Sequence, residues 1–365
     1  MHIMQSPPNA EAIIDGKKYF YFVGTGYFGL HGNPQLIEAA CEATRKYGIG
    51  SATSRSGFGE NPPLLEVERR AAGFFGCDDA FYFVSGYCGN TVLVQCLGDI
   101  YDVLFVDEVA HYSVYDAVCQ SAKRYYPFRH CDPADLAAKL EDNLRPGERP
   151  MVISDGIFPI SGAIPPVPAY LEVLSAYEGA SICLDDAHAT GVIGPNGRGT
   201  YEHFGLQGDN LHFSGTLSKA FGGHGGIIVG SRDYIALIKA RSRLFNGATP
   251  PPVPAAAATA KALELVSNDP GIKTRLWDNV LLVKRELRKL GFELDDTPVP
   301  IICLEIGRAA EMERIHQELM QRGIAIAYTK SYSGVGEEGA LRIAIFSTHT
   351  QEMLHKLLRE LGKLL

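Results

Sequence analysis

The most constraining feature of this sequence is the alternation of short apolar runs with helical patterns. Helical patterns cover residues 90–97, 113–122 and 167–177, and apolar runs cover residues 80–84, 102–106, 151–154, 181–184, 211–214 and 225–230. Parallel strands need crossover connections and are buried on both faces, so they read as short, continuously apolar runs. The alternation therefore predicts an α/β fold with a mostly parallel sheet covered by helices.

The flanking regions indicate a second domain. Asn33-Pro34 predicts a helix to about residue 47, and a loop rich in glycine and serine follows at 48–59. A proline cluster at 249–254 precedes a long helical region at 255–290, after which strands at 299–306, 324–328 and 341–346 alternate with helices at 309–322 and 351–364. We expect residues 1–35 to contribute to a small domain, residues 36–250 to form the large domain, and residues 251–365 to form a small α+β domain.

Charge and composition exclude several classes of function. The net charge of -8 provides no basic surface for nucleic acid. No run approaches the ~20 apolar residues of a membrane span, and the N-terminus shows no export leader. The eight cysteines form no C-x-x-C pair, so we expect reduced thiols and a cytoplasmic protein.

An acid and a histidine follow one of the apolar runs. Asp185 ends the run 181–184, and Asp186 and His188 come directly after it. At the carboxyl end of a parallel strand, a carboxylate can keep a pyridine nitrogen protonated. A helix cap is the structural alternative, and a metal site made of Asp185, Asp186 and His188 lacks a nearby histidine or cysteine cluster to complete it.

A single lysine stands among small and apolar residues after another run. Lys219 has no acid beside it in sequence, and such surroundings disfavour the ammonium and free the amine for imine formation. A solvated surface lysine is the ordinary alternative. The hydroxyls of Thr216 and Ser218, with the glycines that follow, also suit contact with a phosphate.

Two further segments follow strands. Ser85-Gly86-Tyr87 leads from a strand into a helix, so its backbone N–H groups point at any anion near the helix start, although a tight turn explains it equally well. Because the segment lacks the lysine of a P-loop, it favours a cofactor phosphate over a nucleotide triphosphate. His111 closes the next strand and its loop, where it can lie on an aromatic cofactor or serve a structural role.

Two other enzyme classes are disfavoured. Gly24, Gly26 and Gly29 match the dinucleotide fingerprint G-x-G-x-x-G, but the predicted helix begins only at Asn33-Pro34 and no acid occurs near residues 48–55. A Ser-His-Asp hydrolase is disfavoured because no G-x-S-x-G elbow is present.

Together these motifs resemble the α-oxoamine synthases, a family of fold-type I pyridoxal phosphate (PLP) enzymes. The resemblance runs from about Gly24 to the C-terminus, and its most specific parts are residues 185–194 and 215–223. Further segments support the resemblance: residues 27–30, 50–55 and 85–87, His111, Phe245, Pro250-Pro251, residues 341–343 and His349-Thr350. It implies an aspartate aminotransferase-like fold, with a seven-stranded large domain and a smaller α+β C-terminal domain.

The resemblance also implies roles for individual residues. Lys219 would form a Schiff base with PLP and move the Cα proton, Asp185 would pair with the ring nitrogen, and His188 would contact the phenolic oxygen. His111 would stack on the ring, while Tyr27 would lie at the substrate. Ser85, Gly86, Tyr87 and Thr216 would hold the phosphate, and Arg342 would bind the substrate carboxylate. The family acts as a homodimer with its site at the interface.

The implied reaction is the decarboxylative condensation of an amino acid with an acyl-CoA thioester; a PLP-dependent aminotransferase is the alternative. The chain departs from the family pattern at three places. Thr25-Gly26 replaces an asparagine, Pro159 replaces a serine, and Asn246-Gly247 replaces a pair of hydroxyl residues. The sequence names neither the amino acid nor the acyl donor.

Overall fold

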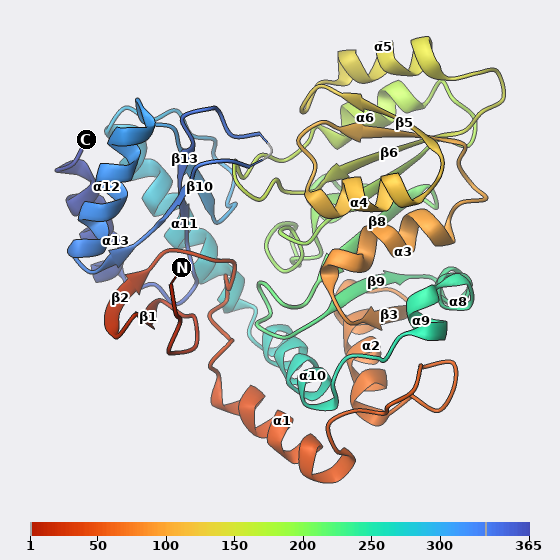
Figure 1. The fold of residues 1–365 in the computed structure, drawn as a ribbon, viewed down its shortest axis with the longest axis horizontal. Coiled ribbons are helices and arrows are strands. Elements are labelled where there is room, and N and C mark those ends of the chain that lie inside the picture. The colour runs from red at the N-terminus through yellow and green to blue at the C-terminus, as the bar shows by residue number, and fades with distance from the viewer. Residues whose placement is uncertain (1, 333) are drawn as a thin grey trace.

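The computed structural model describes residues 2–332 and 334–365, which form two lobes (Figure 1). The larger lobe contains a seven-stranded sheet with the spatial order β3-β9-β8-β7-β6-β4-β5. In this sheet β9 pairs antiparallel with both β3 and β8, and the remaining neighbouring strands pair in parallel. Its strands are β3 (Asp79–Phe83), β4 (Val103–Asp107), β5 (Arg124–Phe128), β6 (Pro150–Asp155), β7 (Ser181–Asp185), β8 (Leu211–Thr216) and β9 (Gly226–Gly230).

Both faces of this sheet are buried, as the apolar runs predict. On β4, Leu104 and Val106 pack into a cluster with residues of α3, α4 and α8. Val103 and Phe105 alternate with them and pack on the opposite face with residues of α5 and α6. The helices of the larger lobe are α1 (Pro34–Tyr47), α2 (Pro62–Phe75), α3 (Gly89–Cys96), α4 (Tyr112–Gln120), α5 (Pro133–Asn143), α6 (Val167–Leu174), α7 (Thr200–His203), α8 (Arg232–Arg241), α9 (Arg243–Gly247) and α10 (Val253–Asn268).

The smaller lobe combines both ends of the chain (Figure 1). An N-terminal hairpin, β1 (Glu11–Ile14) and β2 (Lys17–Tyr21), pairs through β2 with β11 (Ile324–Ala325) in parallel. A second sheet joins β10 (Ile301–Leu304), β13 (Ala340–Ala344) and β12 (Ala327–Thr329), and the lobe's helices are α11 (Gly271–Lys289), α12 (Ala309–Gln321) and α13 (Gln351–Gly362). The division at residues 35 and 250 stays our prediction, although α10, which follows residue 250, packs against α1 and α2 of the larger lobe.

Several elements differ from the sequence expectation. The single helical region expected at 255–290 is two helices, α10 and α11, separated at Asp269-Pro270, because Pro270 disfavours a helical residue before it. The strand expected at 324–328 is split between β11 and β12, which belong to different sheets. Elements α2, β5, α5 and α8 had no clear prediction. Among the described residues, no helix is both long and apolar enough to cross a bilayer.

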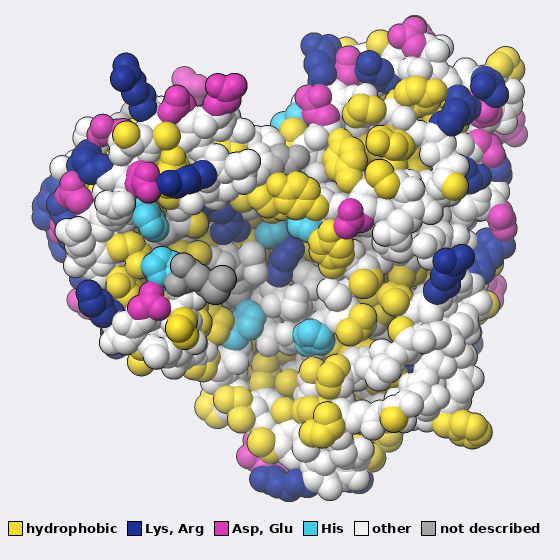
Figure 2. Space-filling model, viewed as in Figure 1, with side chains coloured by type: hydrophobic (Ala, Val, Ile, Leu, Met, Phe, Trp, Pro, Cys, Tyr) yellow, Lys and Arg dark blue, Asp and Glu magenta, His cyan; other side chains and the backbone are white. Residues whose placement is uncertain are grey.

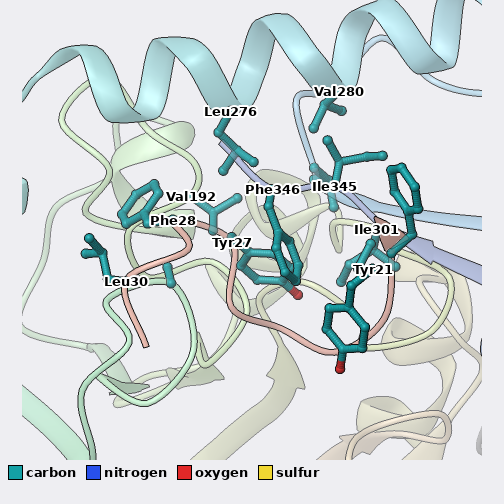
Figure 3. Packing of buried hydrophobic residues seen from close by; sticks show 14 of the residues in the cluster. Tyr21, Tyr27, Phe28, Leu30, Val192, Leu276, Val280, Ile301, Ile345 and Phe346 are labelled. Carbon is teal, nitrogen blue, oxygen red and sulfur yellow. The ribbon is translucent and has the colours of Figure 1, made fainter. Parts of the chain in front are cut away.

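The lobes are joined by a continuous apolar core beneath α11 (Figure 3). Leu276 and Val280 extend from this helix toward Val192, Ile345 and Phe346. All five side chains are fully buried. Burying this surface fixes the smaller lobe against the loops that follow β7.

We expect Leu276→Ala to lower the free energy of unfolding by ~3 kcal/mol, because a fully buried leucine is replaced by a cavity. Leu281, on the same helix but 40% exposed, provides the matched control. Its alanine variant should change stability by less than about 1 kcal/mol in urea unfolding. Equal losses for the two variants would contradict this packing.

Candidate active site

The carboxyl edge of the large sheet collects the polar residues that follow its strands. Asp155 ends β6, Asp185 ends β7 and Thr216 ends β8. Figure 2 shows a hollow between the lobes in which histidine and basic side chains gather. The pocket at this edge is lined by Ser85, Gly86, Tyr87, His111, Ser113, Asp155, Asp185, Ala187, His188, Thr216, Ser218 and Lys219. The structure thus brings most of the predicted site residues to one place.

Asp185 is held by donors from three elements. The amide of Asn90 on α3 donates to its Oδ2 at 2.6 Å, and the hydroxyl of Ser113 on α4 donates to the same oxygen at 3.3 Å. The backbone N–H of Ala187 donates to Oδ1 at 3.1 Å. A carboxylate that is buried and held in this way keeps a fixed direction, and it can accept a further hydrogen bond from a protonated ring nitrogen.

Lys219 lies in the turn after β8, partly accessible from the pocket. Burial of the amine lowers its pKa from 10.5 to about 8, and the carboxylates of Asp185 and Asp155 oppose this shift. A large fraction of the amine is therefore neutral near pH 8, in the form that attacks a carbonyl.

His188 and Tyr27 form a buried pair. The Tyr27 Oη lies 2.8 Å from His188 Nδ1. Burial holds the pKa of His188 well below its usual value, and the positive charges of Lys219 and Arg342 lower it further. Burial raises the pKa of Tyr27 to about 12. A neutral imidazole therefore meets a neutral phenol, and Nε2 of His188 stays available to the pocket.

Arg342 is fixed by the backbone. Its Nε donates to the carbonyl of Pro159 at 2.7 Å, and its Nη1 donates to the carbonyl of Gly24 at 3.1 Å. Arg342 and Tyr27 are not part of the pocket lining given above; Tyr27 connects to it through His188. Arg342 thus keeps further N–H groups for a ligand carboxylate.

His111 begins α4, with its ring in the pocket wall. Its Nδ1 lies 2.7 Å from the Ser113 hydroxyl, and its backbone N–H donates to Asp155 Oδ2 at 2.8 Å. Burial, aided by the charge of Asp185, raises the pKa of Asp155 well above its usual value. Asp155, Asn90 and Ser113 are site residues that we did not predict. Of these, only Asp155 carried a sequence signal, since it directly follows an apolar run.

The turn at Ser85–Tyr87 and the end of β8 approach closely. A Cβ at Gly86 would lie 2.7 Å from the Cβ and Oγ1 of Thr216, so only glycine fits there. The Ser85 hydroxyl accepts from the N–H of Tyr87, and Thr216 Oγ1 lies 2.8 Å from the Ser218 hydroxyl. Hydroxyls and N–H groups gathered before α3 are suited to binding an anion.

The alternatives from the sequence find no geometric support. Gly24 and Gly29 lie between β2 and α1, outside the large sheet, so they do not form a dinucleotide fold. Asp186 Oδ2 accepts from the N–H of Thr200, whereas Asp185 Oδ2 faces Asn90. The two carboxylates thus accept hydrogen bonds from different partners. Within the described part of the chain, the residues that bring three potential metal ligands together are Asp107, His130 and Cys131.

This fold, with a desolvated lysine and a fixed carboxylate at the same sheet edge, defines a fold-type I PLP transferase, as the sequence predicted. The chain belongs to the aminotransferase class I and II family, whose family model matches residues 25–361. It is 34% identical over 365 residues to an 8-amino-7-oxononanoate synthase from Symbiobacterium thermophilum, covering 99% of this chain and 92% of that relative. A putative 8-amino-7-oxononanoate synthase from Desulforudis audaxviator is 35% identical over 97% of this chain and 91% of its own length.

The solved structures agree with this grouping. A serine palmitoyltransferase from S. paucimobilis with bound PLP and myriocin matches with a TM-score of 0.92 and 26% identity, over 100% of this chain and 92% of that chain. The resemblance to the α-oxoamine synthases is thus confirmed.

We expect the Lys219 amine of the cofactor-free protein to titrate near pH 8. Its acetylation rate by acetic anhydride, followed by peptide mass spectrometry across pH, measures this midpoint. Asp185→Asn should move the midpoint lower, because it removes a carboxylate that favours the ammonium. A wild-type midpoint near 10.5 would contradict the desolvated environment.

Proposed function

We propose that this chain is a PLP-dependent acyltransferase of the α-oxoamine synthase type, which condenses an amino acid with an acyl-CoA thioester and releases CO2. The single observation that carries the cofactor assignment is that a low-pKa Lys219 and a fixed Asp185 lie at one sheet edge. The relatives named 8-amino-7-oxononanoate synthase support the reaction type, since they match nearly the whole chain.

The residues of the pocket fit PLP. Asp185 would accept from the ring nitrogen, His111 would cover one ring face, and His188 would meet the phenolic oxygen. The close approach of Gly86 and Thr216 leaves N–H and hydroxyl groups for the phosphate; Ser85 and Tyr87 would complete this anion site. When bound, the cofactor supplies an electron sink for charge that develops at the substrate Cα.

Side chains of this protein would move the proton and bind the substrate. The neutral amine of Lys219 removes the Cα proton, and its pKa near 8 suits both taking up and returning a proton. Arg342, held by the carbonyls of Pro159 and Gly24, directs its remaining N–H groups toward the substrate carboxylate. The Tyr27 phenol bonds His188 Nδ1 and so fixes the orientation of the imidazole.

An aminotransferase is the second candidate, since the description of the matching family favours it. Both reactions use a lysine to move the Cα proton, so the site residues do not separate them. The difference is the second substrate: a synthase needs an acyl thioester before it releases product, whereas an aminotransferase reacts with an amino acid alone and leaves the cofactor in its amine form.

We expect purified protein incubated with PLP to gain a visible absorbance band and, after borohydride reduction, a stable adduct at Lys219. A panel of amino acids with short and long acyl-CoA thioesters should release free thiol only when both substrates are present. Lys219→Ala should lower this rate by about 10³-fold or more, because it removes both the covalent anchor and the base. Lys289→Ala, at an exposed lysine on α11, serves as the control and should leave the rate unchanged.

Conversion of the bound cofactor to its amine form by an amino acid alone, without thiol release, would favour the aminotransferase. A protein that neither develops the band nor forms the adduct would contradict both candidates.

A homodimer with its site at the interface is part of the proposal, and an exposed phenylalanine supports it. Phe58 is 97% exposed in the glycine-rich loop after α1. The base of this loop is rigid: Arg55 is buried, donates to Glu68 at 2.6 Å and to Glu60 at 2.7 Å, and stacks against Phe245. A rigid loop that presents a phenylalanine to solvent suits contact with a second copy.

A cytoplasmic location also belongs to the proposal. All eight cysteines are unpaired, which suits a reducing compartment.

We expect Phe58→Asp to shift the protein from dimer to monomer in analytical ultracentrifugation and to lower activity at least about tenfold, because a charge would be buried at the interface. Leu290→Asp, at a 47% exposed position after α11, is the control and should leave the mass unchanged. A wild-type protein that sediments as a monomer with full activity would contradict the dimer.

A further inference from the structure

His31 contacts the turn that carries Lys219. It lies in the segment between β2 and α1, and its Nε2 is 3.1 Å from the carbonyl oxygen of Ser218, the residue before the lysine. A carbonyl only accepts, so the proton of the imidazole must be on Nε2. Burial lowers the pKa of His31, which favours the neutral ring. Its Nδ1 is buried and has no hydrogen-bond partner among the described residues.

The imidazole occupies space that Gly26 leaves open. A Cβ at position 26 would lie 2.9 Å from both Cε1 and Nδ1 of His31. Any side chain at this position would therefore displace the ring from Ser218. Position 26 is one of the places where the chain departs from the α-oxoamine synthase pattern. The imidazole of His31 occupies the space that a side chain at position 26 would take.

The backbone of the same segment supports the other end of the turn. Gly222 has a φ of +66°, and a Cβ there would lie 2.8 Å from the backbone nitrogen of His31. The N–H of Gly222 in turn donates to the carbonyl of Lys219 at 3.0 Å. One residue, His31, thus contacts the turn before Lys219 through its ring and after Lys219 through its backbone.

We propose that His31 is a positioning residue that fixes the Lys219 turn through its hydrogen bond to the Ser218 carbonyl, in a space made by Gly26. The inference rests on the proposed function only in taking Lys219 as the reacting amine. His31 is not among the residues that line the pocket; it acts through the Ser218 carbonyl to keep the amine in its desolvated place.

The test compares His31→Leu, which removes the donor, with His31→Gln, whose amide can donate to the same carbonyl. We expect His31→Leu to lower the rate of Lys219 acetylation at pH 8 about fivefold in the cofactor-free protein. This is the loss of neutral amine that a pKa rise of about one unit produces when a loosened turn admits water. In the PLP-loaded enzyme kcat should fall about tenfold with KM unchanged. His31→Gln should retain both values within about threefold.

A second variant tests the steric part without removing the imidazole. Gly26→Ala should reproduce the defect of His31→Leu, because the new methyl group displaces the ring. In a His31→Ala background, Gly26→Ala should add nothing further, since the conflict is gone. The control, His203→Leu at the exposed last position of α7, should match the wild type in every readout.

If His31→Leu kept the acetylation midpoint and the kcat of the wild type, the inference would be overturned and the proposed function would stand. A defect in His31→Gln as large as that in His31→Leu at equal melting temperature would also overturn the inference, because the hydrogen bond would then not be responsible. A wild-type protein that binds PLP without any adduct at Lys219 would instead refute the proposed function, and this inference with it.

Discussion

The low pKa of the Lys219 amine depends on its burial and on the carboxylates near it. Burial removes the water that stabilises an ammonium, and the carboxylates of Asp185 and Asp155 restore only part of that stabilisation. Asp185 is prevented from turning fully toward the lysine, because Asn90 and Ser113 hold its Oδ2. The result is an amine that is neutral enough to react, beside an acid whose direction is fixed. A freely rotating carboxylate would pair with the lysine and raise its pKa.

Because the sheet is parallel here, few positions in the sequence have to be specified to bring these residues together. Strands β6, β7 and β8 are neighbours and run in the same direction, so their last residues come together at one edge. Asp155, Asp185 and Thr216 need no long-range sequence pattern to meet, because each only has to end its own strand. The helices that begin at the same edge add the donors of Asn90 and Ser113, which orient the carboxylate.

This geometry explains how much could be predicted from the sequence. Asp185 stands directly after an apolar run, and His188 and Lys219 follow within five residues of one, so a local pattern was sufficient to select them. Asp155 satisfies the same criterion. In contrast, Asn90, Ser113 and His31 act through partners more than twenty residues away, and no local pattern marks them.

The same distinction holds for the fold. Runs buried on both faces were recognised, whereas β5 at the sheet edge alternates in exposure and contains Pro127, which only an edge strand tolerates well. The break between α10 and α11 was marked by Asp269-Pro270, but the helical periodicity on either side obscured it.

One of the three departures from the family pattern, Thr25-Gly26, lies in the segment of residues 24–31. Its Gly24 carbonyl accepts from Arg342, its Tyr27 hydroxyl bonds His188, and its His31 ring bonds the turn before Lys219. The segment follows β2, which pairs with β11 of the smaller lobe, whereas the groups it contacts belong to both lobes. A shift between the lobes would therefore move Arg342, on the smaller lobe, relative to His188 and the Lys219 turn, on the larger lobe. Since Thr25-Gly26 replaces the expected asparagine here and the imidazole of His31 occupies the space beside Gly26, substrate selection by this chain should depend on how this segment is placed.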